Sequence, residues 1–178
     1  MPKTLDVRRH AKRSDPSDED SGLSAEGHAM AEMLGRSAPP YALVVATPLL
    51  RARQTAELIA GRLDQTLPEL APSLAPVLSY SQYLGLAELA DWLAFVRRDP
   101  RARQFGDDQL RIWADLVARV DDDQSVLIAS HGGTIELPAA GLAARLGSML
   151  SGPAFGYCEG VRVTYEGDGP VGLEVIRV

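Results

Sequence analysis

Three segments with the pattern of β-strands, each followed by polar residues, constrain the fold of this 178-residue chain most strongly. In the first, Leu5 and Val7 alternate with polar neighbours, which is the two-residue period of a strand. Two continuous apolar runs, Tyr41–Ala46 and Ser125–Ala129, have the composition of strands in the buried middle of a parallel sheet. We therefore predict an α/β fold, a three-layer α/β/α sandwich around a mostly parallel sheet.

Helical patterns accompany these strands. Ser24 is a candidate N-cap for a helix that ends near Gly35, ahead of two prolines. The next helix begins with Arg51 and Arg53, and residues two apart on a helix point about 200° apart, so at most one arginine faces the strand ends. Two further amphipathic helices are predicted over residues 85–98 and 107–120.

The C-terminal segments 160–165 and 172–178 alternate apolar and polar residues on either side of a glycine-rich turn. They predict an antiparallel hairpin at the edge of the sheet, where a second copy of the chain could pair, although nothing in the sequence indicates an oligomeric state. A short strand is also predicted near Gln65–Leu67. A chain of this length suits one domain, covering residues 1–178.

Charge and composition exclude several classes of function. The net charge of -6 argues against a general nucleic-acid binder, so no nucleic-acid partner is expected. No apolar run of about 18 residues is present, so no membrane association is expected. The N-terminal residues lack the apolar stretch of a signal peptide, which favours a cytoplasmic protein. Cys158 is the only cysteine, which excludes an internal disulfide, and we expect it to be a small buried residue.

Basic residues and histidines follow all three predicted strands. Arg9 and His10 follow the first, Arg51 the second, and His131 the third. Because parallel strands carry their carboxyl ends to the same edge of a sheet, we expect these four residues to converge. Gly132, next to His131, lets the backbone approach a ligand closely. Unpaired N–H groups at the start of the following helix would form an anion-binding site.

This set of side chains suits phosphoryl transfer. A neutral histidine can attack phosphorus, while arginines and a second histidine neutralise the charge on the equatorial oxygens. Arginine also grips phosphate through two parallel hydrogen bonds. Carboxylates do not accompany the histidines in the sequence, so a metal site is disfavoured and no cofactor is expected. His28 is interpreted as a structural or exposed residue, and Asp121–Asp123 as a solvated turn.

Four segments in this order resemble the histidine phosphatase superfamily, which includes cofactor-dependent phosphoglycerate mutases and many small phosphatases. Arg9-His10-Ala11 is similar to its Arg-His-Gly signature, and residues 23–29 to its Leu-Thr-x-x-Gly-x-x-Ala helix opening. Residues 47–56 are similar to its Ser-Pro-Leu-x-Arg-Ala-x-Gln-Thr-Ala segment, and residues 130–133 complete the set.

The resemblance implies a metal-independent, acid-type histidine phosphatase with a phosphohistidine intermediate on His10. It further implies that Arg9 and Arg51 bind the phosphoryl group and that His131 stabilises the transition state. Lys12 and Gly132 are candidate substrate-binding residues on the same basis. The substrate would be a phosphorylated small molecule or a phosphorylated protein.

The chain departs from the family pattern in two places. Ala11 replaces the usual glycine, and the Arg-His-Ala-Lys run looks like the small single-domain phosphohistidine phosphatases. The family's proton donor, a Glu in a Leu-x-Glu segment, would fall near Leu74–Pro76, which contains no carboxylate. Glu69 and Glu88 are candidate substitutes, and the loop that contains Asp18 and Glu19 is another source of a donor.

The missing carboxylate bears on function, because an alkoxide leaving group needs a general acid more than a phosphoramidate does. We predict a phosphatase that hydrolyses phosphomonoesters or phosphohistidine. A phosphoglycerate mutase-type phosphotransferase is one alternative, and a phosphate-ligand binding module with little turnover is the other.

Overall fold

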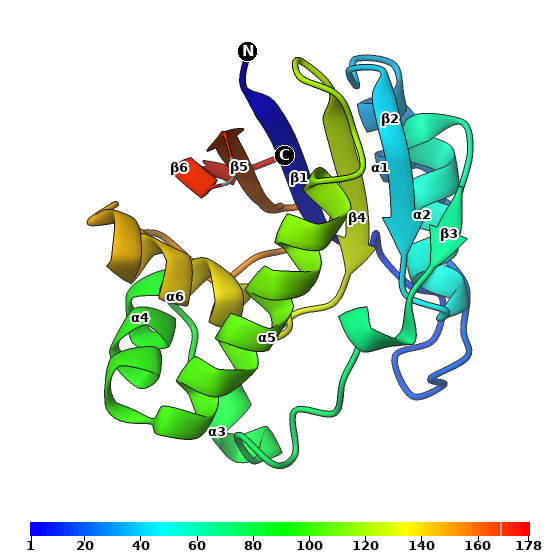
Figure 1. Cartoon of the computed structure of the whole chain (residues 1–178). Helices are drawn as coiled ribbons and strands as arrows, with labels where there is room; N and C mark the ends of the chain where they lie inside the picture. The colour runs from blue at the N-terminus through cyan, green and yellow to red at the C-terminus, as the bar shows by residue number, and fades with distance from the viewer. Residues whose placement is uncertain (168) are drawn as a thin grey trace.

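A six-stranded sheet forms the centre of the protein in a computed structural model that describes residues 1–167 and 169–178 (Figure 1). The strand order is β3-β2-β4-β1-β5-β6. The strands are β1 (Lys3–Arg9), β2 (Tyr41–Ala46), β3 (Gln65–Thr66), β4 (Ser125–Ser130), β5 (Gly160–Glu166) and β6 (Gly169–Ile176). The first four in the chain run parallel, and β5 and β6 are antiparallel to their neighbours, which confirms the predicted sheet and edge hairpin. Asp168, in the predicted hairpin turn, lies outside the described residues.

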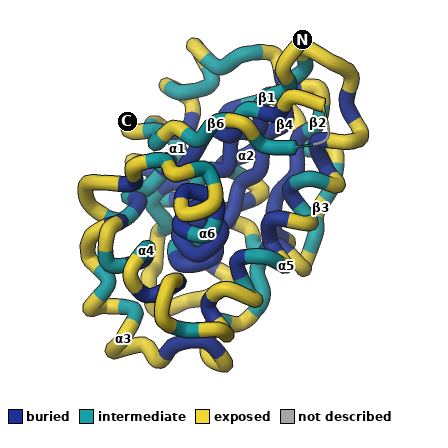
Figure 2. The backbone as a smooth tube through the Cα atoms, turned by 60° about the vertical axis from the view of Figure 1, so that its left-hand side comes forward, coloured by how far each residue is buried: buried dark blue, intermediate teal, exposed yellow. Residues whose placement is uncertain are grey.

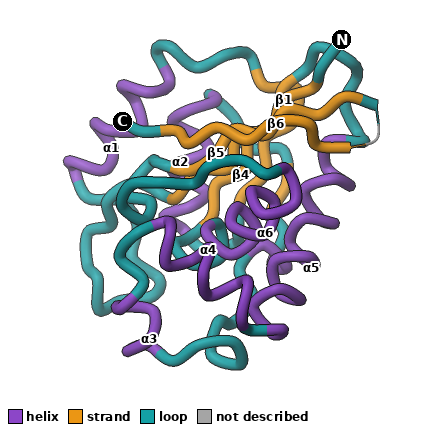
Figure 3. The backbone as a smooth tube through the Cα atoms, turned by 90° about the vertical axis from the view of Figure 1, so that its left-hand side faces the viewer, coloured by secondary structure: helices purple, strands orange, loops and turns teal. Residues whose placement is uncertain are grey.

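Helices cover both faces of the sheet (Figures 1 and 3). The α-helices are α1 (Ala25–Gly35), α2 (Leu50–Ala60), α3 (Tyr80–Gly85), α4 (Leu89–Arg98), α5 (Pro100–Val117) and α6 (Glu136–Leu146), with a 3-10 turn at Pro68–Leu70. One face packs on α1 and α2, and the other on α4, α5 and α6. Most residues of α6 are buried, and this helix runs through the interior of its layer (Figure 2). In the part of the chain that is described, no helix is both long and apolar enough to cross a membrane.

The apolar strands are buried on both faces, which explains why their sequences do not alternate. Val45 and Ile128 point into the core beneath α4, α5 and α6. Their neighbours Val44 and Leu127 point into the second core, beneath α1 and α2. Successive side chains of a strand face opposite sides of the sheet, so both sets must be apolar in a three-layer fold.

Helix boundaries agree with the prediction where a local capping signal was recognised. Ser24 caps α1 as predicted, with its Oγ accepting a hydrogen bond from the Gly27 amide at 3.0 Å. The predicted helix over 107–120 instead begins at Pro100, because Asp99 accepts hydrogen bonds from the amides of the first turn and proline suits the first helical position. The predicted helix over 85–98 corresponds to α4, which begins at Leu89, and the short helix α3 ends at Gly85 before it.

Candidate active site

The carboxyl ends of β1 and β4 bring His10 and His131 together. Arg9 of β1 lies opposite Ser130 of β4, and the His10 amide donates to the Ser130 carbonyl at 2.9 Å. The two imidazole rings follow directly, with centroids 5.2 Å apart and a tilt of 57°. The shared edge predicted from the strand pattern is therefore present.

His10 is buried and held in one tautomer. Its Nδ1 lies 2.7 Å from the Ala11 carbonyl oxygen. Because a carbonyl can only accept, Nδ1 carries the hydrogen and Nε2 carries the lone pair. Burial is the main cause that lowers the pKa of His10 to about 3, with the charges of Arg51 and Arg9 acting in the same direction. The ring is thus neutral at neutral pH, with Nε2 available as a nucleophile.

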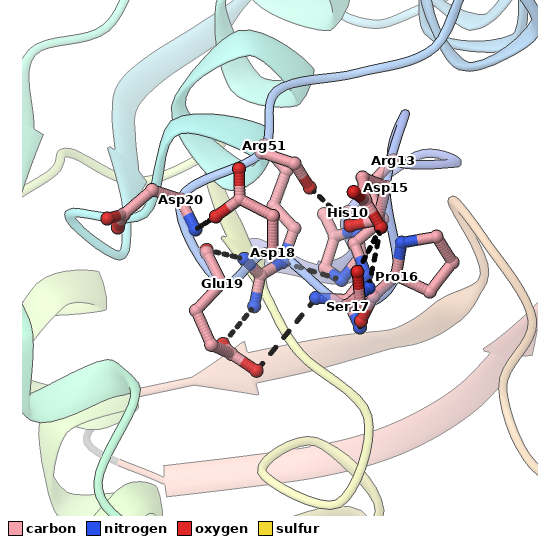
Figure 4. A network of polar contacts seen from close by, with 10 residues as sticks. His10, Arg13, Asp15, Pro16, Ser17, Asp18, Glu19, Asp20 and Arg51 are labelled. Atoms are coloured by element: carbon pink, nitrogen blue, oxygen red, sulfur yellow. Dashed lines mark hydrogen bonds and ion pairs between the residues drawn. The ribbon is translucent and has the colours of Figure 1, made fainter.

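Arg51 lies in the first turn of α2, which follows β2, and its side chain reaches His10 from the carboxyl end of that strand. Its Nε donates to His10 Nε2 at 3.2 Å, and the side chain is almost fully buried. Arg53 is exposed, so the prediction that only one of the two arginines faces the strand ends is confirmed. The rest of the Arg51 guanidinium contacts Glu19 through the backbone carbonyl at 2.5 Å and Oε2 at 3.3 Å (Figure 4). A carboxylate therefore already lies against the group that would bind a phosphoryl oxygen.

His131 and Arg9 complete the cluster and have unsatisfied nitrogens. His131 Nε2 lies 2.8 Å from the Thr47 hydroxyl, and burial lowers the pKa of the ring to about 3. Arg9 donates to the Phe155 carbonyl at 2.7 Å and lies over the Tyr157 ring. Among the described residues, His131 Nδ1 and Arg9 Nε are buried without a hydrogen-bond partner. Two such nitrogens beside a nucleophile suit an anionic ligand.

Comparison with protein families identifies the chain. The model of the histidine phosphatase superfamily (branch 1) matches residues 7–176. The chain belongs to this superfamily. A search of curated proteins finds no match.

Solved histidine phosphatase-like structures share the fold at low sequence identity. The mycobacterial glucosyl-3-phosphoglycerate phosphatase aligns with a TM-score of 0.65 and 18% identity, covering 98% of this chain and 97% of that one. A phosphoserine phosphatase from Entamoeba histolytica, in complex with 3-phosphoglyceric acid, aligns with a TM-score of 0.64 and 14% identity over 90% of each chain. A phosphoglycerate mutase from Bacillus anthracis has a TM-score of 0.64 and 19% identity, covering 99% of this chain and 92% of that one.

The region where histidine phosphatases carry a proton donor is close to the site here, but it is apolar. A Cβ added to Gly133 would clash with Leu74 Cδ1, so Leu74 packs against Gly133, the second glycine after His131. Glu69 and Glu88 are exposed, and no described contact joins either carboxylate to the histidines or arginines of the site. Their role as donors stays a prediction without geometric support.

The two predicted substrate-binding residues have different surroundings. Lys12 is half-buried, and its Nζ pairs with Glu26 Oε2 at 2.5 Å. Gly132 lies against the site, because a Cβ there would approach Arg9 Cζ to 3.4 Å. His28, on α1, has no described side-chain contact with the cluster.

Glu136 is a buried residue of the site that the sequence analysis did not assign. Its carboxylate accepts hydrogen bonds from the Gly133 amide at 2.6 Å and the Phe155 amide at 3.1 Å. Burial raises its pKa. Of the N–H groups that were expected to be free for an anion before α6, the Gly133 amide is therefore satisfied by Glu136. Glu136 instead ties the turn after His131 to the loop that holds Arg9.

Proposed function

We propose that this protein is a phosphatase that hydrolyses phosphomonoesters or phosphohistidine through a phosphohistidine intermediate on His10. The observation that carries the proposal is the neutral His10 ring, whose Nε2 lone pair faces the Arg51 guanidinium while Nδ1 is bound to a carbonyl. The ring needs no deprotonation before attack, and the nearest cation is placed for the group being attacked.

The reaction consists of two in-line transfers. In the first, a bond forms between His10 Nε2 and phosphorus while the bond from phosphorus to the ester oxygen, or to the ring nitrogen of a phosphohistidine, breaks, and the leaving group takes a proton from water. In the second, water attacks phosphorus, the bond to Nε2 breaks, and phosphate leaves with His10 returned to its neutral form. In both steps Arg9, Arg51 and His131 surround the phosphoryl oxygens, and the unsatisfied nitrogens of Arg9 and His131 gain acceptors.

The roles of the outer residues are also part of the proposal. Gly132 lets the substrate approach Arg9 closely, and Lys12 contributes positive charge at the rim when it is released from Glu26. Phosphorylated small molecules or phosphorylated proteins are the substrates, and a cytoplasmic location fits such substrates. A binding module with little turnover is the second candidate, because residues 74–76 contain no carboxylate and the Glu19 side chain contacts Arg51.

Phosphate release from an aryl phosphate tests this proposal. We expect turnover by the unmodified chain, loss of at least about 10³-fold in kcat for His10→Ala, and a 32P label on the protein after acid quenching. His28→Ala is the matched control, because it removes a histidine outside the cluster and should keep full activity. No turnover by the unmodified chain would favour the binding module, and equal turnover by His10→Ala would exclude the nucleophile.

A further inference from the structure

An uncharged pocket opens beside the phosphoryl-binding cluster. It has a volume of about 570 Å³ and is lined mainly by Leu74, Ala75, Leu78, Tyr80, Tyr83 and Gly132. None of its lining residues carries a charge. Helix α3, which supplies the tyrosines, lies at the end of the molecule toward which β1, β2 and β4 point (Figure 1).

Gly132 joins this pocket to the cluster. A Cβ added there would lie 2.6 Å from the Tyr83 phenol oxygen and 3.4 Å from Arg9 Cζ. The phenol and the guanidinium therefore approach the same backbone position, one residue after His131. A phosphate ester bound at Arg9 would have its organic group near the mouth of the pocket.

The pocket wall is aromatic and is held in place from behind. The rings of Tyr80 and Tyr83 stack at 6.5 Å with an angle of 16° between their planes. Tyr83 also packs edge-on against Trp92, which is 1% exposed, with ring centroids 5.8 Å apart. Burial raises the pKa of Tyr83, so this phenol stays neutral. Such a surface favours flat apolar groups through burial and stacking.

We propose that this pocket binds the organic group of the substrate, and that this group is an uncharged aromatic ring, as in an aryl phosphate monoester. The inference rests on the proposed phosphatase activity and specifies its substrate class. An organic group with a carboxylate, as in phosphoserine or phosphoglycerate, would lose water here without gaining a cation. Arg9 and Arg51 serve the phosphoryl group, and Lys12 is paired with Glu26.

The leaving group supports the same substrate class. Leu74 lines the pocket and packs against Gly133, and it lies in the segment where the family pattern places its donor. A phenol such as that of a solvated tyrosine has a pKa of about 10, far below that of water at about 15.7. When Nε2 of His10 bonds to phosphorus, an aryl oxygen therefore leaves as phenolate and takes its proton from water. The reaction then needs no carboxylic acid at residues 74–76.

Substrate comparison on the full chain tests the inference. We expect kcat/KM for 1-naphthyl phosphate to exceed that for phosphoserine and 3-phosphoglycerate by about tenfold or more, since burial of an aromatic ring is the difference. Tyr80→Ala removes an exposed part of the wall without opening the core, because Tyr80 is 76% exposed. It should lower kcat/KM for 1-naphthyl phosphate by about three- to tenfold, mainly by raising KM, and leave kcat/KM for phosphoserine unchanged.

Leu84→Ala is the matched control, because Leu84 is an exposed residue of the same helix that does not line the pocket. It should leave kcat/KM unchanged for all three substrates. A preference for 3-phosphoglycerate, or equal effects of Tyr80→Ala and Leu84→Ala, would overturn the aromatic pocket while His10-dependent hydrolysis remained. Hydrolysis of none of the three substrates, or hydrolysis independent of His10, would overturn the phosphatase proposal and the pocket with it.

Discussion

The cluster at the strand ends and the segment that crosses in front of it, residues 67–88, are held in place by different forces. His10 and Arg51 are each 5% exposed, and His10 hydrogen-bonds to the backbone of the strand ends. The crossing segment contains prolines at three positions, an irregular chain and α3, a helix without a fully buried residue. Backbone register positions the first region, and a few side-chain contacts position the second.

This difference suggests separate roles, with catalysis in the strand-end cluster and substrate selectivity in the crossing segment. A change in the strand-end cluster alters a buried hydrogen-bond network, which has large energetic consequences. A change in the crossing segment alters a partly exposed apolar surface, where burial of one side chain is worth a few kcal/mol at most. The first region should therefore govern kcat for every substrate, and the second should govern which organic group is accepted.

Among these variants, removal of the Arg51 side chain should have the largest effect on activity. Arg51→Ala takes away the cation that contacts His10 Nε2, and we expect kcat/KM to fall by about 10²–10³-fold for all substrates alike. Arg53→Ala, at an exposed position on the same helix, is the control and should have no effect. Substrate-dependent losses in Arg51→Ala would show that the two regions are not separable. Phosphate release under steady-state conditions measures the effect.

Acid should destabilise the protein through the two histidines of the strand-end cluster. The pKa values of His10 and His131 are lowered from 6.5 to about 3, so the unfolded chain binds more protons between these limits. Stability is therefore full above about pH 6.5 and falls as the pH drops toward 3, by up to about 1.4 kcal/mol per pH unit for each histidine. Urea unfolding at pH 7, 5.5 and 4.5 measures this slope. His10→Gln should flatten it and His28→Gln should not, and identical slopes in all three chains would contradict the burial effect.

Gly132→Ala tests the contact between the two regions. The added methyl group would lie 2.6 Å from the Tyr83 oxygen, so Tyr83 must shift away from residue 132. We expect kcat/KM to fall by about tenfold, or about 1.4 kcal/mol, with the larger loss for aryl substrates. Gly141→Ala is a control, since nothing lies within 4 Å of a Cβ there. Equal losses for aryl and alkyl phosphates would place the effect in Arg9 alone.

Glu19→Gln should give the smallest effect, a change in phosphate binding at Arg51. The substitution removes the negative charge beside Arg51 and keeps the contact with the backbone carbonyl of residue 19, so the inhibition constant of inorganic phosphate should fall by about two- to fivefold. Asp20→Asn removes a charge from the same loop without a hydrogen bond to Arg51. If both variants respond equally, net loop charge rather than the contact with Arg51 controls phosphate binding.

Sequence reasoning located the strand-end residues because their positions follow from local patterns. Apolar runs define the strands, and the parallel arrangement then brings Arg9, His10, Arg51 and His131 to one edge. Helical spacing predicted that at most one of Arg51 and Arg53 points to this edge, and the resemblance to the family pattern implied that it is Arg51. The comparisons support the family and fold, and the roles assigned to these four residues await the experiments above.

Contacts between distant segments were not predictable in the same way. Glu136 accepts hydrogen bonds from two loops, Glu19 reaches Arg51 from an irregular loop, and Tyr157 lies beneath Arg9. No periodicity or capping pattern encodes such contacts, because they depend on how loops cross after the sheet has formed. The sequence could have predicted the start of α5, since Asp99-Pro100 is a recognisable N-terminal signal of a helix.

The hydrogen bond from His10 Nδ1 to the Ala11 carbonyl has a chemical consequence for the intermediate. The bond involves adjacent residues of one rigid strand end, so the imidazole cannot turn over without losing it. Only one of the two ring nitrogens is thus exposed to phosphorus. The trapped adduct should be a single positional isomer, with phosphorus on the nitrogen far from Cβ, and the 31P chemical shift of the denatured protein would distinguish it from the other.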